Sequence, residues 1–199
     1  MVVVSPARRV VLRAAVAVSV MALAAGCGPS KPSFQGSDIS GTNLGRGLRL
    51  TDHNGQLRTI DDFKGKVVVA FFGFAQCPDV CPTALAELAE VMKNLGPDAD
   101  KVQVLMITVD PERDTQEVLK QYVTAFDPRF LGLRGDAQAL KQTADSFKAY
   151  YARAAGSNSN YSMDHTAAFY ILDQEGSARV LANNTIGAPA LEHDIRALL

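Results

Sequence analysis

The chain alternates short apolar runs with segments of helical periodicity. Residues 66–72 are apolar at odd and even positions alike after the first lysine, which predicts a strand buried on both faces of a largely parallel sheet. Residues 101–109 predict a second buried strand, and residues 83–95 between them carry apolar side chains at helical spacing. The pattern therefore predicts a strand, helix and strand at the centre of the chain.

Weaker signals continue the alternation of strands and helices. A short strand is expected at 130–133, between helices at 115–126 and 136–147. Residues 150–162 are rich in Gly, Ser and Asn at their core, which favours a mobile loop, and a helix over 189–199 closes the chain. These segments add helices on either side of the central strands.

Two hairpins complete the predicted fold. The first joins residues 48–51 and 56–59 through an Asn-Gly turn, where His53 is expected to be a solvated turn residue rather than a ligand. The second joins 166–172 to 178–182. This order of elements is the thioredoxin-like arrangement: an α/β fold with a central mixed sheet, flanking helices and an N-terminal hairpin.

The first 26 residues are predicted to be a lipoprotein signal peptide. Three arginines precede the uncharged apolar stretch 14–25, which is too short for a comfortable membrane span. The following LAAGC, ending at Cys27, resembles the lipobox of bacterial lipoproteins, in which the cysteine is lipidated and becomes the first residue. Cys27 is then an anchor to the extracytoplasmic face of the cell membrane, with 27–47 as the tether and 48–199 as the domain. An ordinary secretory signal would also export the chain, by the general or the twin-arginine route.

Composition adds constraints on domain number and partners. The 199 residues are 47% hydrophobic and 21% charged, which supports one compact domain rather than global disorder. A formal net charge of -1 without a basic patch argues against nucleic acid as a partner. Apart from Cys27, the cysteines are Cys77 and Cys81, and export favours their pairing more than the cytosol would.

Cys77 and Cys81 lie at the predicted strand-to-helix turn. With Cys77 opening the helix, one helical turn separates the two Cα atoms by about 6 Å, which a disulfide accepts. A helix N-terminus favours the thiolate that redox exchange and metal ligation both need. A structural staple, a redox pair and a metal site are all open, although so short a loop gains little stability from closure.

His165 is the expected third member of the site. In this fold the segment that enters the strand at 166–172 faces the active cysteines, so His165 lies beside the turn. Two thiolates and an imidazole form a soft donor set suited to Cu(I), or to Cu(II) with a further oxygen ligand. Asp164 is a candidate for orienting the imidazole, and Met163 is more readily explained by core packing than by axial ligation.

Three segments resemble the Sco/SenC family: GFAQCPDVCPT at 73–83, VDPERD at 109–114 and DHTA at 164–167. The similarity extends over roughly residues 45–199. It implies a membrane-anchored, thioredoxin-fold protein involved in copper delivery to the dinuclear centre of cytochrome c oxidase, and in thiol–disulfide exchange. By position, the resemblance implies that copper binds Cys77, Cys81 and His165. The copper-bearing oxidase subunit is the implied partner.

The second of these segments allows two interpretations. Asp110 and Arg113 are expected either to brace the loop near the site or to form a capped helix start with a surface ion pair.

Two functional classes compete. A copper metallochaperone would pass its ion to the oxidase by ligand exchange, whereas a membrane-anchored thiol–disulfide oxidoreductase would act on the oxidase's copper-ligand cysteines, with Cys77 as nucleophile and Cys81 as resolving thiol. The three-residue spacer and the facing histidine favour copper. A peroxidase lacks its activating threonine, because Phe74 and Pro78 stand three residues before the cysteines. Structural zinc would normally require one more ligand.

Overall fold

The computed structural model describes residues 32–154 and 161–199, and the compact unit begins at Ser33. The predicted signal peptide at 1–26 and the predicted lipid anchor Cys27 lie outside the described residues. No helix in the described part of the chain is long and apolar enough to cross a membrane.

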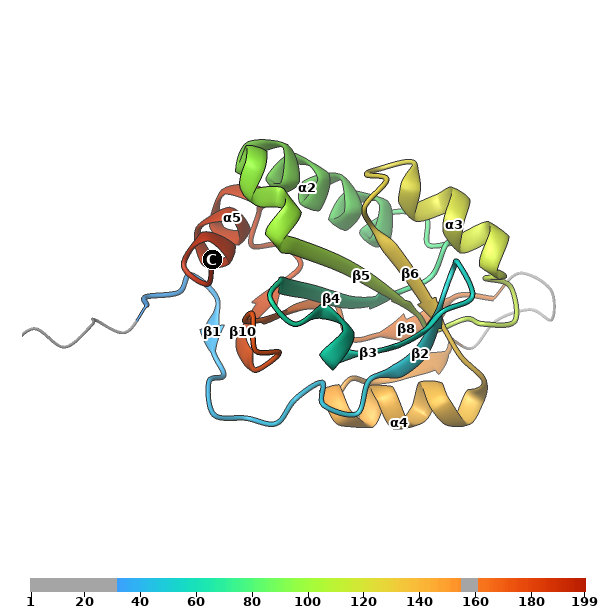
Figure 1. Ribbon diagram of the computed structural model, residues 1–199. Coiled ribbons are helices and arrows are strands. Elements are labelled where there is room, and N and C mark those ends of the chain that lie inside the picture. Colours follow the sequence, from blue (N-terminus) through green and yellow to red (C-terminus); the bar gives the residue numbers. More distant parts are fainter. Residues whose placement is uncertain (1–31, 155–160) are drawn as a thin grey trace, which may run out of the picture. The chain divides into compact units, whose positions relative to one another are not determined.

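One eight-stranded mixed sheet forms the centre of the domain (Figure 1). Its strands β4, β5 and β6 are parallel, and β9 pairs antiparallel with β4. In sheet order the strands are β1 (Ser37–Asp38), β10 (Ala178–Asn183), β9 (Ala168–Leu172), β4 (Val67–Gly73), β5 (Val102–Thr108), β6 (Leu131–Arg134), β2 (Arg49–Asp52) and β3 (Leu57–Thr59).

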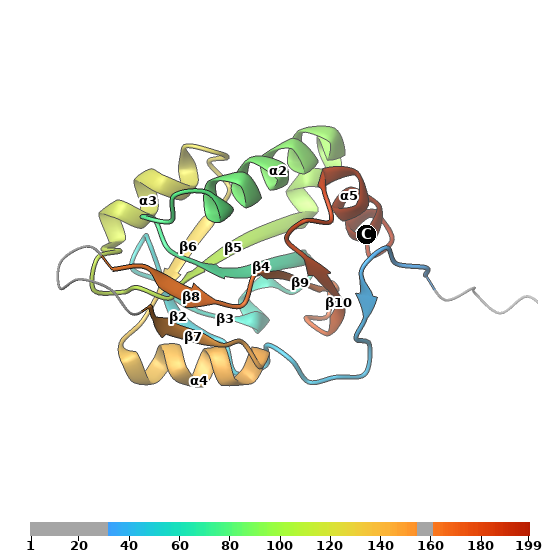
Figure 2. The ribbon, with the colours of Figure 1, turned by 180° about the vertical axis from the view of Figure 1, so that it is seen from behind.

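In the described part of the chain, four α-helices cover the two faces of this sheet. Helices α2 (Val80–Leu95), α3 (Gln116–Thr124) and α5 (Ala188–Arg196) lie on one face, and α4 (Ala137–Phe147) lies on the other (Figures 1 and 2). Two short 3-10 helices, η2 (Ile60–Phe63) and η3 (Gly96–Lys101), precede β4 and β5. The predicted thioredoxin-like α/β arrangement is confirmed.

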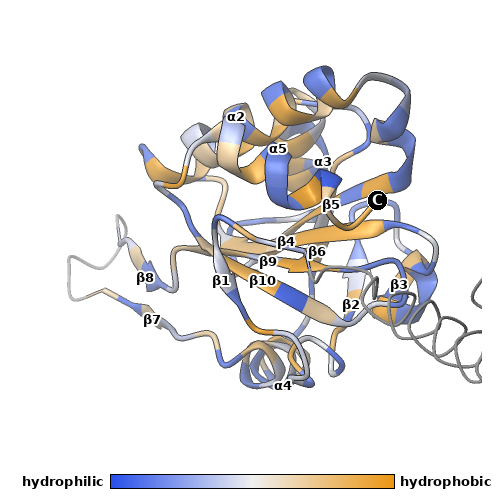
Figure 3. Ribbon diagram, turned by 90° about the vertical axis from the view of Figure 1, so that its left-hand side faces the viewer, coloured by the Kyte–Doolittle hydropathy of each residue, from blue (hydrophilic) through white to orange (hydrophobic). Residues whose placement is uncertain are grey.

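Every residue of β4 and β5 is buried, as their apolar patterns predicted. Val67, Val69 and Phe71 enter the core beneath α2 and α5, whereas Val68, Ala70 and Phe72 enter the core that contacts α4. The colouring of Figure 3 shows these central strands as mostly hydrophobic and the helices as mixed. Because side chains alternate along a strand, β4 packs into the cores on both faces of the sheet. Packing on both faces holds its C-terminal end in place.

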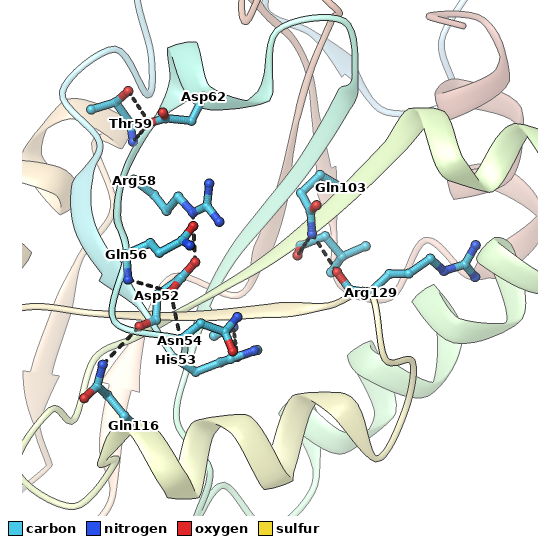
Figure 4. Close-up of polar contacts among 12 residues, drawn as sticks. Asp52, His53, Asn54, Gln56, Arg58, Thr59, Asp62, Gln103, Gln116 and Arg129 are labelled. Atoms are coloured by element: carbon cyan, nitrogen blue, oxygen red, sulfur yellow. Dashed lines mark hydrogen bonds and ion pairs between the residues drawn. The ribbon is translucent and has the colours of Figure 1, made fainter.

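The predicted hairpin at the N-terminal side is β2–β3, and a buried carboxylate closes its turn (Figure 4). Asp52 accepts the backbone N–H groups of Asn54 and Gln56 at 2.8 and 3.0 Å, and Arg58 Nε at 2.8 Å. Burial alone would raise the pKa of Asp52, but these hydrogen bonds outweigh it and hold the pKa below its ordinary value. The turn is therefore stabilised by Asp52 in its charged form.

His53 differs from its prediction as a solvated turn residue. Its side chain is buried, and Nδ1 accepts the backbone N–H of Gly132 at 3.1 Å. Burial lowers the pKa of His53, which favours the neutral ring. The imidazole links the hairpin to β6, and the Asn-Gly signal could not reveal this because Gly132 lies far along the chain.

The segment predicted as a tether is partly built into the domain. Strand β1 pairs with β10, and the buried carboxylate of Asp194 accepts the N–H groups of Gln35 and Gly36 at 2.7 and 2.8 Å. Residues 33–47 therefore belong to the compact unit rather than to a free linker.

The start of the loop predicted at 150–162 is a strand instead, whereas the Gly-, Ser- and Asn-rich core of that loop, at 155–160, lies outside the described residues. Strands β7 (Tyr151–Arg153) and β8 (Met163–His165) pair antiparallel as a separate two-stranded sheet, with Tyr151 opposite His165. Strand β9 consequently begins only at Ala168. His165 is thus carried by a hairpin outside the main sheet.

Candidate metal centre

The two cysteines flank the start of α2. Strand β4 ends at Gly73, the chain turns through residues 74–79, and the helix begins at Val80, so that Cys77 does not open the helix as the sequence geometry assumed. Cys77 therefore lies in the turn, and Cys81 lies in the first helical turn. The backbone N–H of Cys81 points at the sulfur of Cys77, 3.4 Å away. Both thiols are free.

The two thiols differ in exposure. Cys77 is partly exposed, whereas Cys81 is only 1% exposed. Burial, followed by the neighbouring sulfur of Cys77, raises the pKa of Cys81 to about 12, although a hydrogen bond with the backbone of Phe74 opposes this change. The Cys81 thiol is therefore protonated at neutral pH until a metal or a reaction partner removes its proton.

Gly73 leaves room for the buried sulfur. A Cβ atom at this position would lie 2.7 Å from Cys81 Sγ, which is closer than real Cβ contacts allow. Glycine at the end of β4 thus permits the sulfur to approach the backbone.

His165 faces the cysteine turn from β8, as the fold order predicted. Its ring stands edge-on to Phe74, with centroids 6.0 Å apart, and Nδ1 lies 3.2 Å from the carbonyl oxygen of Thr166. A carbonyl partner favours the proton on Nδ1, which leaves Nε2 free to accept a proton or a metal. Asp164 is exposed, and no contact in the described part of the chain joins its carboxylate to the ring. The orienting role expected of Asp164 is therefore taken by the backbone of Thr166.

The three side chains line two neighbouring hollows that share His165. An open pocket of about 520 Å³ is lined by Cys77 and His165, and a small apolar void beside it is lined by Cys81 and His165. Within residues 32–154 and 161–199, no three His, Cys, Asp or Glu side chains are gathered closely enough to hold a metal ion. Ligation by all three would therefore require side-chain movements around the shared imidazole. Met163 packs against the core at the rim of this pocket.

Asp114 holds the backbone just before the cysteines, a role that sequence reasoning missed. Its Oδ2 accepts the hydroxyl of Thr108 at 2.6 Å and the N–H of Ala75 at 3.0 Å. The side chain is fully buried, and Oδ1 has no hydrogen-bond partner among the described residues. Burial raises the pKa of Asp114 against the opposing effect of its two hydrogen bonds. The only sequence signal was its place in the DPERD segment.

Asp110 and Arg113 brace the site, which confirms the first of their two predicted roles. They form a largely buried ion pair, and helix α3 is capped by Thr115 instead. Arg113 Nη1 also donates to Gln76 Oε1 and to the carbonyl oxygen of Tyr161, both at 3.0 Å. One guanidinium therefore joins the cysteine turn to the segment that leads into β8.

Fold and site together define a thioredoxin-like domain with a cysteine pair at the first strand-to-helix turn and a facing histidine. The chain belongs to the SCO1/SenC family, whose model matches residues 37–199. A similar relative is the SCO2-like protein of Rickettsia felis, which is 38% identical over 152 residues, or 74% of each chain.

Solved structures share the same architecture. Bradyrhizobium japonicum ScoI with copper bound has a TM-score of 0.71 at 39% identity, covering 76% of this chain and 97% of that one. A SCO1/SenC family lipoprotein from Bacillus anthracis has a TM-score of 0.68 at 25% identity, covering 83% and 99%. BsSco, a member of the Sco family of cytochrome c oxidase assembly proteins, has the same fold at 22% identity, with a TM-score of 0.62 and coverage of 82% and 98%.

Proposed function

We propose that the chain is a copper metallochaperone that delivers copper to the dinuclear copper centre of cytochrome c oxidase during assembly. Copper is its cargo, and the ligands are Cys77, Cys81 and His165. The observation that carries this proposal is the single imidazole that lines the hollows of both cysteines. The copper-bound state of ScoI, which is 39% identical, supports the same cargo here.

The donor chemistry fits copper. Two sulfurs and one imidazole suit Cu(I) in trigonal geometry, and Nε2 is the ring nitrogen left free by the carbonyl beside Nδ1. Burial makes the Cys81 thiolate unfavourable, and the bond between copper and this sulfur would offset that cost. The half-exposed Cys77 is then the ligand that an incoming acceptor can reach first.

Transfer by ligand exchange follows from this difference in exposure. An acceptor thiolate approaches at Cys77, while Cys81 remains covered by the core and holds its share of the coordination. The proposed acceptor is the copper-bearing oxidase subunit.

We also propose that Cys27 carries the lipid that keeps the domain at the extracytoplasmic face of the membrane. A Cys27→Ser chain should then be recovered in the soluble fraction instead of the membrane fraction.

Metal analysis and absorption spectroscopy test the ligand set. The reduced protein should bind about one Cu(I), and Cu(II) should give a thiolate charge-transfer band in the visible range. His165→Ala should weaken binding and shift the band. His193→Ala is the matched control, because His193 lies on α5, outside both hollows, and contacts Asp194. Equal copper affinity and an unchanged band in His165→Ala would show that the ligand assignment is wrong.

A second candidate function is thiol–disulfide exchange with the oxidase's copper-ligand cysteines. The observation that favours it is the pairing of a half-exposed Cys77 with a buried Cys81, which is the arrangement of an attacking and a resolving thiol. Its test is the reduction potential of the pair. A disulfide too stable to be reduced in its compartment would exclude this activity, and it would leave copper binding by the reduced protein unaffected.

A further inference from the structure

The hairpin that carries His165 is attached to the domain at two separate places. Strands β7 and β8 form their own small sheet, which projects beyond the main sheet in Figure 3. At its base, the N–H of Ala149 donates to the carbonyl of Ala144 at the end of α4, and Tyr151 packs against the core. At its far end, Met163 lies opposite Arg153 and packs against the core, and the described polar contacts to the main domain run through Tyr161 and Arg153.

Tyr161 is the centre of the far attachment. Its hydroxyl donates to Asp110 Oδ1 at 2.8 Å, and its carbonyl oxygen accepts from Arg113 Nη1 at 3.0 Å. Its ring lies between two guanidinium groups: Arg113 Cζ is 3.7 Å from the ring centroid and Arg153 Cζ is 3.5 Å away. Stacking of this kind stabilises a ring that is only partly buried.

The other end of this contact network reaches the cysteine turn. Arg113, which contacts both the ring and the carbonyl of Tyr161, also donates to Gln76, the residue before Cys77. A single side chain therefore links the segment that carries His165 with the segment that carries the first cysteine.

We propose that Tyr161 is a positioning residue that fastens the β7–β8 hairpin and thereby controls how readily His165 reaches, and leaves, the metal. The inference rests on the proposed copper function, to which it adds a control of release. Because copper passes on by stepwise ligand exchange, a looser hairpin frees the imidazole sooner. Tyr161 itself contacts neither cysteine, and it acts through Arg113, Asp110 and the hairpin backbone.

Two measurements on the full chain test the proposal with Tyr161→Phe, which keeps the stacked ring and removes the hydroxyl. In the copper-free protein, the amide of Ala154, which donates to the carbonyl of Ser162 across the hairpin, should exchange about ten-fold faster, as expected for the loss of one hydrogen bond to a carboxylate. In the Cu(I)-loaded protein, a chelator should remove copper faster by a similar factor. The Cu(II) band should shift in the same direction as in His165→Ala.

Tyr170→Phe is the matched control. Tyr170 is buried on β9 in the core that contacts α4, and its hydroxyl makes no hydrogen bond in the described part of the chain, so its loss breaks no such bond. This variant should leave amide exchange in the hairpin and copper loss unchanged. Tyr161→Leu removes the stacked ring as well and should exceed Tyr161→Phe in both readouts.

The outcomes separate the inference from the proposed function. Unchanged exchange of Ala154 in Tyr161→Phe would overturn the fastening role. Faster exchange with unaltered copper loss and an unaltered band would overturn the positioning of His165. Failure of the proposed function would appear instead in the parent chain, which would bind no copper, while the exchange comparison would still decide whether Tyr161 fastens the hairpin.

Discussion

Replacing Asp114 should change the stability of this domain in a pH-dependent way, because its carboxyl group is buried with only one oxygen hydrogen-bonded. In Asp114→Ala, the hydroxyl of Thr108 and the N–H of Ala75 both lose their acceptor. An unsatisfied buried donor costs about 1–3 kcal/mol. Part of this cost is offset because a buried charge is removed, so we expect a net loss of about 2 kcal/mol.

Asp114→Asn isolates the charge from the hydrogen bonds. The amide oxygen can still accept from Thr108 and Ala75, but it cannot ionise. Burial raises the pKa of Asp114 in the folded state, so the native protein holds the proton more tightly than the unfolded chain does. The contribution of Asp114 to the free energy of unfolding of the wild-type protein is therefore greatest at low pH. It is lost as pH rises from the ordinary pKa of 3.8 through the raised pKa. The loss amounts to about 1.4 kcal/mol for each pH unit that separates the folded-state pKa from the unfolded one.

Urea unfolding of the reduced proteins from about pH 4 to about pH 8 measures this difference. Relative to wild type, Asp114→Asn should become progressively more stable across the window and then level off. A difference that is the same at both ends would refute the buried-carboxyl reasoning. If Asp114→Ala unfolds with the same free energy as the wild-type protein, the carboxylate does not hold the cysteine turn in place.

Three further predictions concern the site and its scaffold. Gly73→Ala should displace Cys81 Sγ from the new Cβ and weaken copper binding, as measured by chelator competition. Gly65→Ala is the control: Gly65 has open space around it but a positive φ, so this variant should lower stability and leave copper affinity unchanged. Below about pH 9, iodoacetamide should label Cys77 and spare Cys81 in the folded protein, because burial raises the pKa of Cys81 to about 12; equal labelling rates would contradict this. Asp52→Ala should lower the free energy of unfolding by about 3 kcal/mol through the loss of two backbone hydrogen bonds and a buried ion pair, with a smaller loss in Asp52→Asn; calorimetry showing equal losses would argue against a role for the charge.

The sequence predicted those parts of the fold that local pattern determines. Strands β4 and β5 were apparent because their sequences are mostly apolar on both faces, and the order of elements then placed His165 opposite the cysteine turn. Strand β7 was missed because Tyr151–Arg153 is only three residues long and half-exposed, and because its partner lies beyond a polar segment.

The supporting contacts of the site depend on packing between distant segments, which one sequence does not display. Asp114 and Tyr161 act on residues 39 and 48 positions away, at Ala75 and Arg113. His53 carried a strong turn signal that said nothing of its contact with β6. The sequence therefore revealed the side chains with distinctive chemistry and one possible role of Asp110 and Arg113, but it did not reveal the contacts of Asp114 and Tyr161.

X-ray absorption spectroscopy of the Cu(I)-loaded protein decides the proposed copper site, because it counts the atoms bound to the metal. We expect two sulfur ligands and one nitrogen in the wild-type chain, with the nitrogen lost in His165→Ala and retained in His193→Ala. Coordination by sulfur alone in the wild-type chain, or an unchanged nitrogen ligand after the loss of His165, would contradict the proposed copper site.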